Sequence, residues 1–201
     1  PGLGENVKAH SLIRAIIRHI KEQLLSRISL VFDADGIGLL IRDKEILRDY
    51  KAPVYLTPNV NEIKKLKDAF IGTIDPDVDD CTIVRKLLNR INENATVVLK
   101  GPLDKIITNE EGYHCSVVGS ARRIGGQGDL LSGSLGLFSY WANLHRGAMI
   151  EGVSAKIMAA YSACALTRIC NKLAYQQKGR SMITSDMIDQ IEKAFKVCFE
   201  R

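Results

Sequence analysis

The feature that most constrains the fold is an alternation of short apolar runs with helical segments. Three runs, at residues 28–32, 53–56 and 95–99, have the length of buried strands, and segments with helical periodicity separate them. Strands that alternate with helices favour a mainly parallel sheet with helices on both faces. The sequence therefore predicts an α/β fold.

The remaining elements follow from periodicity and turn residues. Helices are expected near residues 6–26, 37–49, 59–70, 80–92, 127–146, 152–178 and 184–200. Thr184 or Ser185 is expected to cap the last helix. Strand-like runs on both sides of Asn109-Glu110-Glu111-Gly112 predict a hairpin over residues 104–118. At 201 residues the chain has the length of one ordinary domain, so a single domain over residues 1–201 is predicted.

Polar side chains follow the three strand-like runs in turn: Asp33 and Asp35, then Thr57, Asn59 and Glu62, then Lys100. In open α/β sheets, ligands bind outside the carboxyl ends of the strands. These side chains and the turn at residues 125–129 are therefore expected to converge on one rim of the sheet. Asp33 and Asp35 are expected to orient loops or water there rather than to do chemistry.

The turn at Gly125–Gly133 has the composition of a phosphate site. Gly125, Gly126 and Gly128 fall within four residues, and a helical apolar run follows. Glycines let backbone N–H groups approach a ligand closely, and the start of a helix adds its positive end. Asp129 would repel a phosphate, which indicates another task, such as accepting a proton or facing a metal ion. The alternative is a glycine-rich loop in which Asp129 only favours the helix N-terminus.

Composition excludes several classes of protein. A net charge of +5, spread along the chain, suits anionic small molecules such as nucleotides, and no basic stripe with interleaved aromatics indicates nucleic-acid binding. No apolar run reaches the roughly 18 residues that cross a bilayer. The five cysteines lack C-x-x-C spacing, which favours reduced thiols in the cytoplasm or the mitochondrion. The four histidines form no metal-ligand pattern.

Five ordered motifs together resemble the ATP-dependent NAD(P)H-hydrate dehydratases, a family of ribokinase-like fold. They are Pro1-Gly2-Leu3-Gly4, Asp33-Ala34-Asp35-Gly36, Leu56-Thr57-Pro58-Asn59 with Glu62, Lys100-Gly101 with Asp104, and Gly125–Gly133. The resemblance covers essentially the whole chain. Members carry a further N-terminal strand, glycine-rich loop and helices, so the chain is expected to be N-terminally truncated.

The resemblance implies repair of damaged nicotinamide cofactors. The (S)-hydrates of NADH and NADPH would lose water at the expense of ATP, with Mg²⁺ accompanying the nucleotide. Phosphorylation would turn the C6 hydroxyl, a poor leaving group, into a phosphate that the ring nitrogen can expel. Asp129 would be the general base that takes the hydroxyl proton.

The same resemblance implies two sets of binding residues. The hydrate would contact Gly4, Asn59, Val60, Asn61, Glu62, Ile63, Lys64, Lys65 and Asp129. ATP would contact Lys100, Gly101, Pro102, Leu103, Asp104, Gly125, Gly126, Gln127, Gly128, Leu130, Leu131, Ser132, Gly133 and Ser134. The metal ligands stay unassigned, with Glu62 a candidate through water.

Several alternatives stay open. Asn59 and Glu62 fit helix-capping positions, although Ser or Thr is the preferred cap, and Lys100 fits a solvated lysine at a strand end. Pro102-Leu103 stands where family members often have polar residues. The chain could instead be a ribokinase-like kinase of a vitamin precursor, or a nucleotide-binding fragment without turnover. A homo-oligomer is compatible with the sequence.

Overall fold

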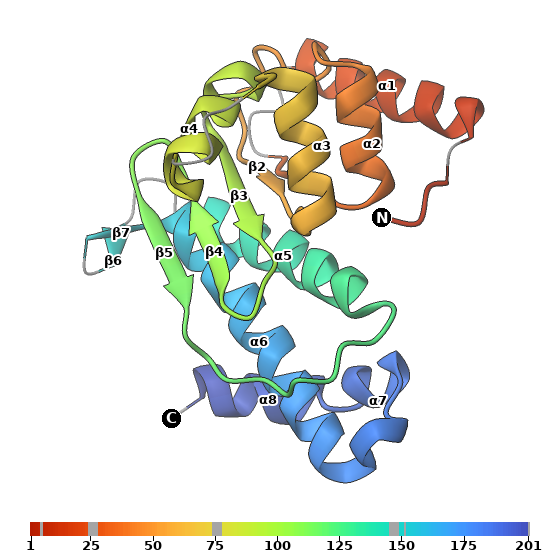
Figure 1. Cartoon of the computed structure of the whole chain (residues 1–201), viewed down its shortest axis with the longest axis vertical. Helices are drawn as coiled ribbons and strands as arrows, with labels where there is room; N and C mark the ends of the chain where they lie inside the picture. The colour runs from red at the N-terminus through yellow and green to blue at the C-terminus, as the bar shows by residue number, and fades with distance from the viewer. Residues whose placement is uncertain (5, 24–27, 74–77, 145–148, 151, 201) are drawn as a thin grey trace. The chain divides into compact units, whose positions relative to one another are not determined.

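The computed structural model describes residues 1–4, 6–23, 28–73, 78–144, 149–150 and 152–200. It divides into two compact units, Pro1–His114 and Cys115–Arg201 (Figure 1). Each unit has its own helices, and each is described by itself below. The single domain over residues 1–201 stays a prediction.

The first unit is built on a five-stranded sheet in the order β1-β2-β3-β4-β5. Its elements are α1 (Val7–Glu22), β1 (Leu30–Phe32), α2 (Asp35–Arg42), β2 (Val54–Leu56), α3 (Val60–Phe70), α4 (Asp80–Ile91), β3 (Ala95–Leu99), β4 (Asp104–Ile107) and β5 (Gly112–Cys115). β1, β2 and β3 are parallel, and β4 runs antiparallel to β3. The predicted α/β class with a mainly parallel sheet is confirmed. The predicted hairpin is present as β4 and β5, although β5 ends three residues earlier than expected.

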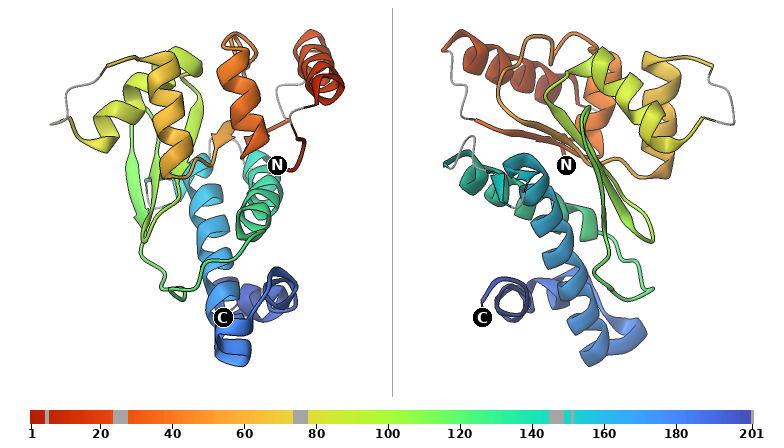
Figure 2. Two further views of the ribbon diagram at one scale, coloured as in Figure 1. Left: turned by 45° about the vertical axis from the view of Figure 1, so that its right-hand side comes forward. Right: turned by 90° about the vertical axis from the view of Figure 1, so that its left-hand side faces the viewer.

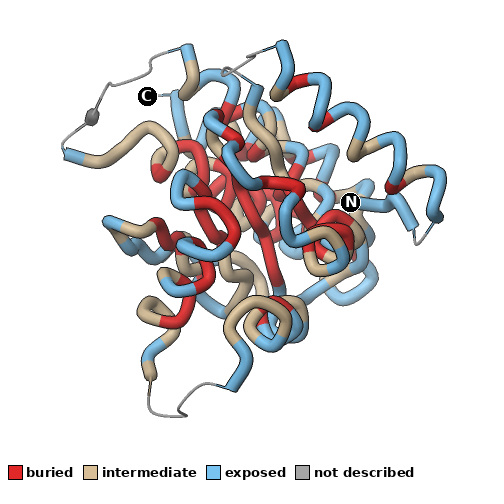
Figure 3. Tube along the Cα trace, turned by 90° about the horizontal axis from the view of Figure 1, so that it is seen from above, coloured by how far each residue is buried: buried red, intermediate tan, exposed pale blue. Residues whose placement is uncertain are grey.

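One hydrophobic core joins the helices to the sheet. α2 packs on α3 and α3 on α4, while α4 also contacts β3 and β4. Leu40, Leu66 and Leu87, one from each of these helices, are fully buried in the same cluster as Leu56 and Val97 of the sheet. In Figure 3 the buried stretches are red, and α1 is largely pale blue because only one stripe of it packs inward. The sheet therefore has a rigid support beneath the loops that follow its strands.

The helix predicted over residues 37–49 is wrong at its end. α2 stops at Arg42, and residues 44–49 form turns closed by bonds such as Tyr50 N–H to the Leu47 carbonyl. Asn92, which is 45 residues away from Leu47, donates its side-chain amide to the Leu47 and Tyr50 carbonyls at 2.9 Å each. These distant bonds satisfy carbonyls of the turn segment that follows α2.

The second unit is mainly helical. Its elements are α5 (Gln127–Leu144), β6 (Met149–Ile150), β7 (Val153–Ser154), α6 (Ala155–Lys178), the 3₁₀ turn η1 (Gly179–Ser181), α7 (Thr184–Ile188) and α8 (Ile191–Phe199). α5 and α8 each pack against α6 (Figure 2). Ring contacts between Phe138 of α5 and Phe199 of α8, 5.3 Å between centroids, join the two outer helices.

Three sequence predictions in this unit need correction. The helix expected over 184–200 is two helices, and the one expected from residue 152 begins at Ala155 after the short β6–β7 hairpin. Residues 145–146 of the first predicted helix lie outside the described residues. Ile183, and neither Thr184 nor Ser185, occupies the N-cap of α7, and its N–H bonds Asp186. Thr184 instead donates its hydroxyl to the Gly125 carbonyl.

None of the helices in the described ranges is long and apolar enough to cross a bilayer.

The buried tyrosines of the first unit predict a loss of stability at high pH. Burial raises the pKa of Tyr50 to about 12, above its ordinary value of 10.0, and its hydroxyl donates to the Ile28 carbonyl at 2.7 Å. Between these two pH values the unfolded chain releases the proton that the folded chain retains, so stability falls as pH rises. Urea unfolding across this pH range should show that the free energy of unfolding of Tyr50→Phe declines less steeply with pH than that of the native chain. The same change at exposed Tyr140 is the control, and equal slopes for all three proteins would contradict the prediction.

Candidate active site

A buried carboxylate draws together the carboxyl ends of β1, β2 and β3. Asp33, 3% exposed, accepts hydrogen bonds from Thr57 Oγ1 at 2.7 Å and from Lys100 Nζ at 2.6 Å. The Thr57 N–H bonds the Phe32 carbonyl, and the Lys100 N–H bonds the Pro58 carbonyl, both at 3.0 Å. Backbone pairing thus continues past the strands and sets the three side chains face to face. The predicted convergence is confirmed for these three side chains, and that of the turn at residues 125–129 stays a prediction.

Lys100 lies between two carboxylates. Its ammonium nitrogen is 2.6 Å from Asp33 Oδ1 and 4.0 Å from Glu62 Oε2, and the lysine side chain is 23% exposed. The ammonium is therefore paired with Asp33 rather than extended into solvent. A ligand phosphate near Lys100 would meet a cation whose charge Asp33 already offsets.

The first turn of α3 is closed by a capping box. Asn59 Oδ1 accepts the Asn61 and Glu62 N–H groups at 2.9 and 3.0 Å, while Glu62 Oε2 accepts the Asn59 N–H at 2.7 Å. This satisfies backbone donors that a helix start leaves without partners. The capping interpretation of Asn59 and Glu62 is confirmed. Because Glu62 also lies near Lys100, the cap connects α3 to the strand-end cluster.

The other residues predicted to contact the hydrate divide by exposure. Val60, Asn61, Lys64 and Lys65 are exposed on α3, whereas the side chain of Ile63 is buried in the hydrophobic core. Solvent-exposed side chains on this turn are available to a ligand. The Ile63 side chain is not, because it supports α3 from below.

Gly4 is held at the start of α2. Its φ of +65° lies in the left-handed region, and its N–H donates to Asp35 Oδ2 at 2.7 Å. Ala34, between the two aspartates, also has a positive φ of 45° and stands at the N-cap of α2. A non-glycine residue in this region is uncommon, so the link between β1 and α2 is a strained turn.

The segment Lys100–Asp104 forms a short loop between β3 and β4. Asp104 is buried, and its Oδ1 accepts the Gly101 N–H at 3.1 Å. Pro102 and Leu103 are exposed at the tip. The loop is therefore closed by its own carboxylate and presents an apolar tip.

The glycine turn begins α5 in the second unit. Gly126 has a φ of +82°, its carbonyl accepts the Leu130 N–H, and the helix starts at Gln127. The first amides of a helix have no intrahelical acceptor, so those of Gln127, Gly128 and Asp129 lie at an anion-attracting end. Asp129 is exposed in this first turn. The turn thus combines amide donors with an accessible carboxylate.

The residues after Asp129 differ in their burial, and the buried ones hold the start of α5 in place. Leu131 and Ser132 are buried, and Ser132 donates its hydroxyl to the Asp129 carbonyl at 3.1 Å. Leu130 and Ser134 are half-buried, and Gly133 is exposed with open space where a Cβ would stand. α5 is thus fixed from its inner side and leaves Asp129 and Gly133 accessible.

Two residues that hold the glycine turn were missed from the sequence. Thr184 of α7 donates to the Gly125 carbonyl, and the side-chain amide of Asn171 of α6 donates to the Arg122 carbonyl at 2.9 Å. Asn171 is 1% exposed in the middle of a long helix, where asparagine is uncommon in a core. A polar residue in the apolar pattern of this helix was the available sequence signal for a structural role. Its hydrogen-bond partners, however, lie far away in sequence and could not be predicted.

The predicted contact residues belong to both units. Gly4 and the segments 59–65 and 100–104 lie in Pro1–His114, and residues 125–134 lie in Cys115–Arg201. That the two groups face each other across one site stays a prediction. Within the described ranges, no group of three or more His, Cys, Asp or Glu side chains is arranged to hold a metal ion.

Comparison with known proteins identifies the family of this chain. A family model described as NAD(P)H-hydrate dehydratase matches residues 1–193. The chain belongs to the NAD(P)H-hydrate dehydratase family. The resemblance inferred from the five motifs is thereby confirmed.

Curated relatives in this family carry the name ATP-dependent (S)-NAD(P)H-hydrate dehydratase. The protein from Nematostella vectensis is 41% identical over 203 residues, covering 99% of this chain and 54% of the relative. The protein from Homo sapiens is 40% identical, covering 100% of this chain and 56% of the relative. The protein from Danio rerio is 38% identical, covering 100% of this chain and 59% of the relative. The chain therefore spans between 54% and 59% of the length of these relatives.

Solved structures give the fold. A hypothetical protein from Streptococcus mutans is similar with a TM-score of 0.74 at 20% identity, covering 98% of this chain and 63% of that one. A ribokinase-like superfamily protein from Enterococcus faecalis is similar with a TM-score of 0.67 at 16% identity, covering 100% of this chain and 62% of that one. The predicted ribokinase-like fold is confirmed.

The geometry of the family's glycine turn predicts unequal effects at two neighbouring glycines. A Cβ on Gly126 would lie 2.9 Å from Thr184 Oγ1 and 3.0 Å from its Cγ2, at a φ of +82°, whereas a Cβ on Gly125 meets no atom within 4 Å. Gly126→Ala should lower the free energy of unfolding by about 1–2 kcal/mol, because strain at positive φ adds to the clash.

Thermal unfolding followed by circular dichroism measures this effect. Gly125→Ala is the matched control and should change stability by less than about 0.5 kcal/mol. Adding Thr184→Ala to Gly126→Ala should recover part of the loss, because two of the close atoms disappear. Equal losses for the two glycine variants would show that the Gly126 conformation is not what stabilises the turn.

Proposed function

We propose that this chain catalyses ATP-dependent dehydration of the (S)-hydrates of NADH and NADPH. The observation that carries the proposal is the glycine turn of a family member, which presents an exposed carboxylate, Asp129, beside the amides of a helix start. A base beside an anion-binding helix end is what transfer of a phosphoryl group to a hydroxyl requires.

Asp129 is the general base in the proposed first step. The C6 hydroxyl oxygen of the hydrate attacks the γ-phosphorus of ATP, its proton passes to the Asp129 carboxylate, and ADP leaves. The amides of the glycine turn stabilise the charge on the transferring phosphoryl group. Exposure of Asp129 leaves it accessible to a substrate hydroxyl.

Elimination completes the proposed reaction. The lone pair of the ring nitrogen expels phosphate as the C6–O bond breaks, and loss of a proton from the neighbouring ring carbon restores the dihydronicotinamide. The net change is one hydrate and one ATP to reduced dinucleotide, ADP, phosphate and a proton. The protein needs only to position a kinase-like transfer, since the electron-rich ring supplies the second step.

The binding residues proposed for the two substrates follow the family's motifs. Gly4 and the segment 59–65 are proposed to bind the hydrate, while segments 100–104 and 125–134 bind ATP. The exposed first turn of α3 and the closed loop at Gly101–Asp104 support this assignment. Mg²⁺ is proposed to arrive with ATP, since phosphates and water provide most of its ligands in such sites. Glu62, partly exposed beside Lys100, would reach it through water.

Two further properties belong to this proposal. The chain is proposed to act in the cytoplasm or the mitochondrion, and its five free cysteines are compatible with a reducing compartment. Its partners are small molecules, and self-association into a homo-oligomer is compatible with the described surface.

The proposal is tested by incubating the protein with NADH hydrate, ATP and Mg²⁺ and following the return of reduced-nicotinamide absorbance. Recovery that depends on ATP, with ADP and phosphate formed in equal amounts, would support it. Phosphorylation of a thiazole or pyrimidine alcohol without action on the hydrate would instead identify a vitamin-precursor kinase. ATP binding by calorimetry without any turnover would identify a binding fragment.

A further inference from the structure

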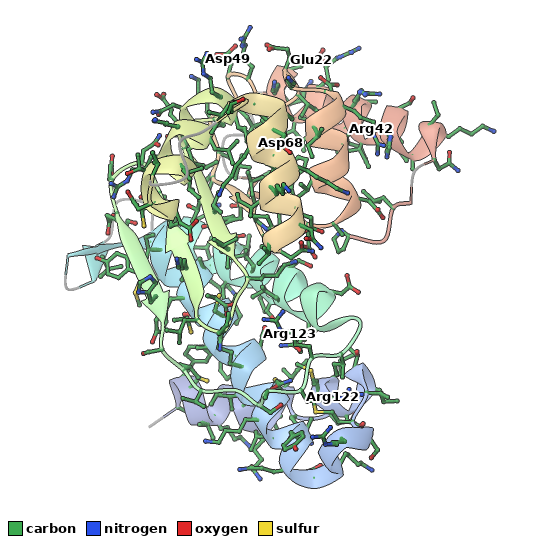
Figure 4. All side chains as sticks on the ribbon, viewed as in Figure 1. Glu22, Arg42, Asp49, Asp68, Arg122 and Arg123 are labelled. Carbon is green, nitrogen blue, oxygen red and sulfur yellow. The ribbon has the colours of Figure 1, made fainter. Side chains whose placement is uncertain are left out.

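Two arginines immediately precede the glycine turn and have no role in the function proposed above. Arg122 and Arg123 are exposed on the segment between β5 and α5, and both side chains are labelled in Figure 4. Among the residues that the structure describes, neither guanidinium forms an ion pair. Only Ile124 separates the pair from Gly125.

The turn itself lacks a cationic side chain. Residues 124–134 contain no lysine or arginine, and their single charge is the carboxylate of Asp129. In the other unit, the Lys100 ammonium is already paired with Asp33 at 2.6 Å. Within residues 124–134, backbone amides are the only groups that could offset the Asp129 carboxylate and the phosphates. Including the arginine pair turns a segment of charge −1 into one of charge +1, since two cations join one anion.

The backbone that carries the arginines is held by a buried side chain. Asn171 Oδ1 accepts the Ser120 N–H at 2.6 Å, and Asn171 Nδ2 donates to the Arg122 carbonyl at 2.9 Å. A Cβ on Gly119 would lie 3.2 Å from Asn171 Oδ1, so the segment packs closely on α6. Asn171 is 1% exposed, so its buried side-chain amide finds its hydrogen-bond partners in this segment.

We propose that Arg122 and Arg123 bind the nucleotide phosphates and favour ATP over ADP, with Asn171 as the positioning residue. This inference rests on the proposed function. The planar guanidinium donates two parallel N–H groups to a phosphate, which suits it to this task better than a point charge. ATP carries one phosphate more than ADP, so the added cations stabilise the triphosphate complex more than the diphosphate complex.

The test is calorimetric titration of the full chain with ATP and, separately, with ADP, both with Mg²⁺. Arg122→Ala/Arg123→Ala should weaken ATP binding by about tenfold or more and ADP binding by clearly less, and the difference should shrink at high salt. Arg122→Lys/Arg123→Lys keeps the charge and should lose only part of the affinity. The matched control is Lys86→Ala/Arg90→Ala, which removes the same charge from exposed positions of α4 and should change neither affinity.

The positioning role is tested through Asn171→Ala. It should lower ATP affinity selectively in the native protein and have little further effect in the arginine double variant, which a purely structural role would not produce. If Asn171→Ala fails to fold, the variants of the exposed arginines alone test whether the pair binds the nucleotide phosphates.

The outcomes separate this inference from the proposed function. Unchanged ATP affinity in the arginine variant of a chain that binds ATP and turns over the hydrate would overturn only the inference. Equal losses of ATP affinity and ADP affinity in the arginine variant would overturn the proposal that the arginines favour ATP over ADP. A native chain that binds no ATP would overturn both.

Discussion

Replacing Asp129 by asparagine is expected to lower turnover of the NADH hydrate by about 10²–10⁴-fold while ATP affinity stays close to that of the native chain. The amide cannot accept the hydroxyl proton, so the attacking oxygen would have to lose it to water. The glycine-turn amides that bind phosphate are unchanged by the substitution. Removal of a carboxylate beside the phosphates should, if anything, reduce repulsion of ATP.

Two measurements check this expectation. Single-turnover rates report the chemical step, and calorimetric titration reports ATP affinity. Glu192→Gln is the matched control, because Glu192 is an exposed carboxylate in the first turn of α8.

The alternative reading of Asp129 makes a different prediction. If its carboxylate only stabilised the helix N-terminus, Asp129→Asn would cost about 0.3–1 kcal/mol of stability, and turnover would be nearly native. Near-native turnover would therefore remove Asp129 from the general-base role. A loss of turnover that Glu192→Gln does not share would support that role.

Replacing Lys100 by methionine is expected to lower the free energy of unfolding by about 3 kcal/mol. The change leaves the Asp33 carboxylate, 3% exposed, with a hydrogen bond from Thr57 but without its counter-charge. Burial of an uncompensated charge costs more than loss of the pair as a whole. The Lys100 side chain is 23% exposed, so water can reach this position in the variant. The loss of stability should therefore be smaller than for a fully buried pair.

A double variant isolates this effect. Asp33→Asn/Lys100→Met removes both charges and should be more stable than Lys100→Met alone, as judged by urea unfolding followed by circular dichroism. Lys105→Met is a matched control, because the side chains of the Lys105–Asp80 pair at 2.8 Å are 37% and 44% exposed, and the pair should therefore matter less. A double variant no more stable than the single one would show that the Asp33–Lys100 contact does not hold the strand ends together.

Local patterns predicted the elements whose bonds are local. The capping box of Asn59 and Glu62 closes within four residues, and the hairpin around residues 109–112 depends on turn chemistry at its own tip. The length and apolar character of the strand-like runs were enough to predict the parallel part of the sheet, because β1, β2 and β3 are short, apolar and separated by helices. These elements need no knowledge of distant residues.

Errors arose where a distant residue decided the outcome. α2 ends at Arg42, and the segment after it is held by Asn92, which donates to the carbonyls of Leu47 and Tyr50, 45 and 42 residues away. Thr184 does not cap its own helix because its hydroxyl reaches Gly125, 59 residues earlier. A periodicity argument covers a window of about 11–18 residues and cannot include such bonds.

The sequence by itself determined the α/β class, the family and the polar groups that follow each strand, because each can be read from short motifs and their order along the chain. Only the tertiary structure decided that Lys100 pairs with Asp33, 67 residues away, and that Asn171 holds the segment before the glycine turn. The reason is physical. A buried polar group must find a partner, and which partner it finds depends on the packing of the whole unit rather than on its neighbours in sequence.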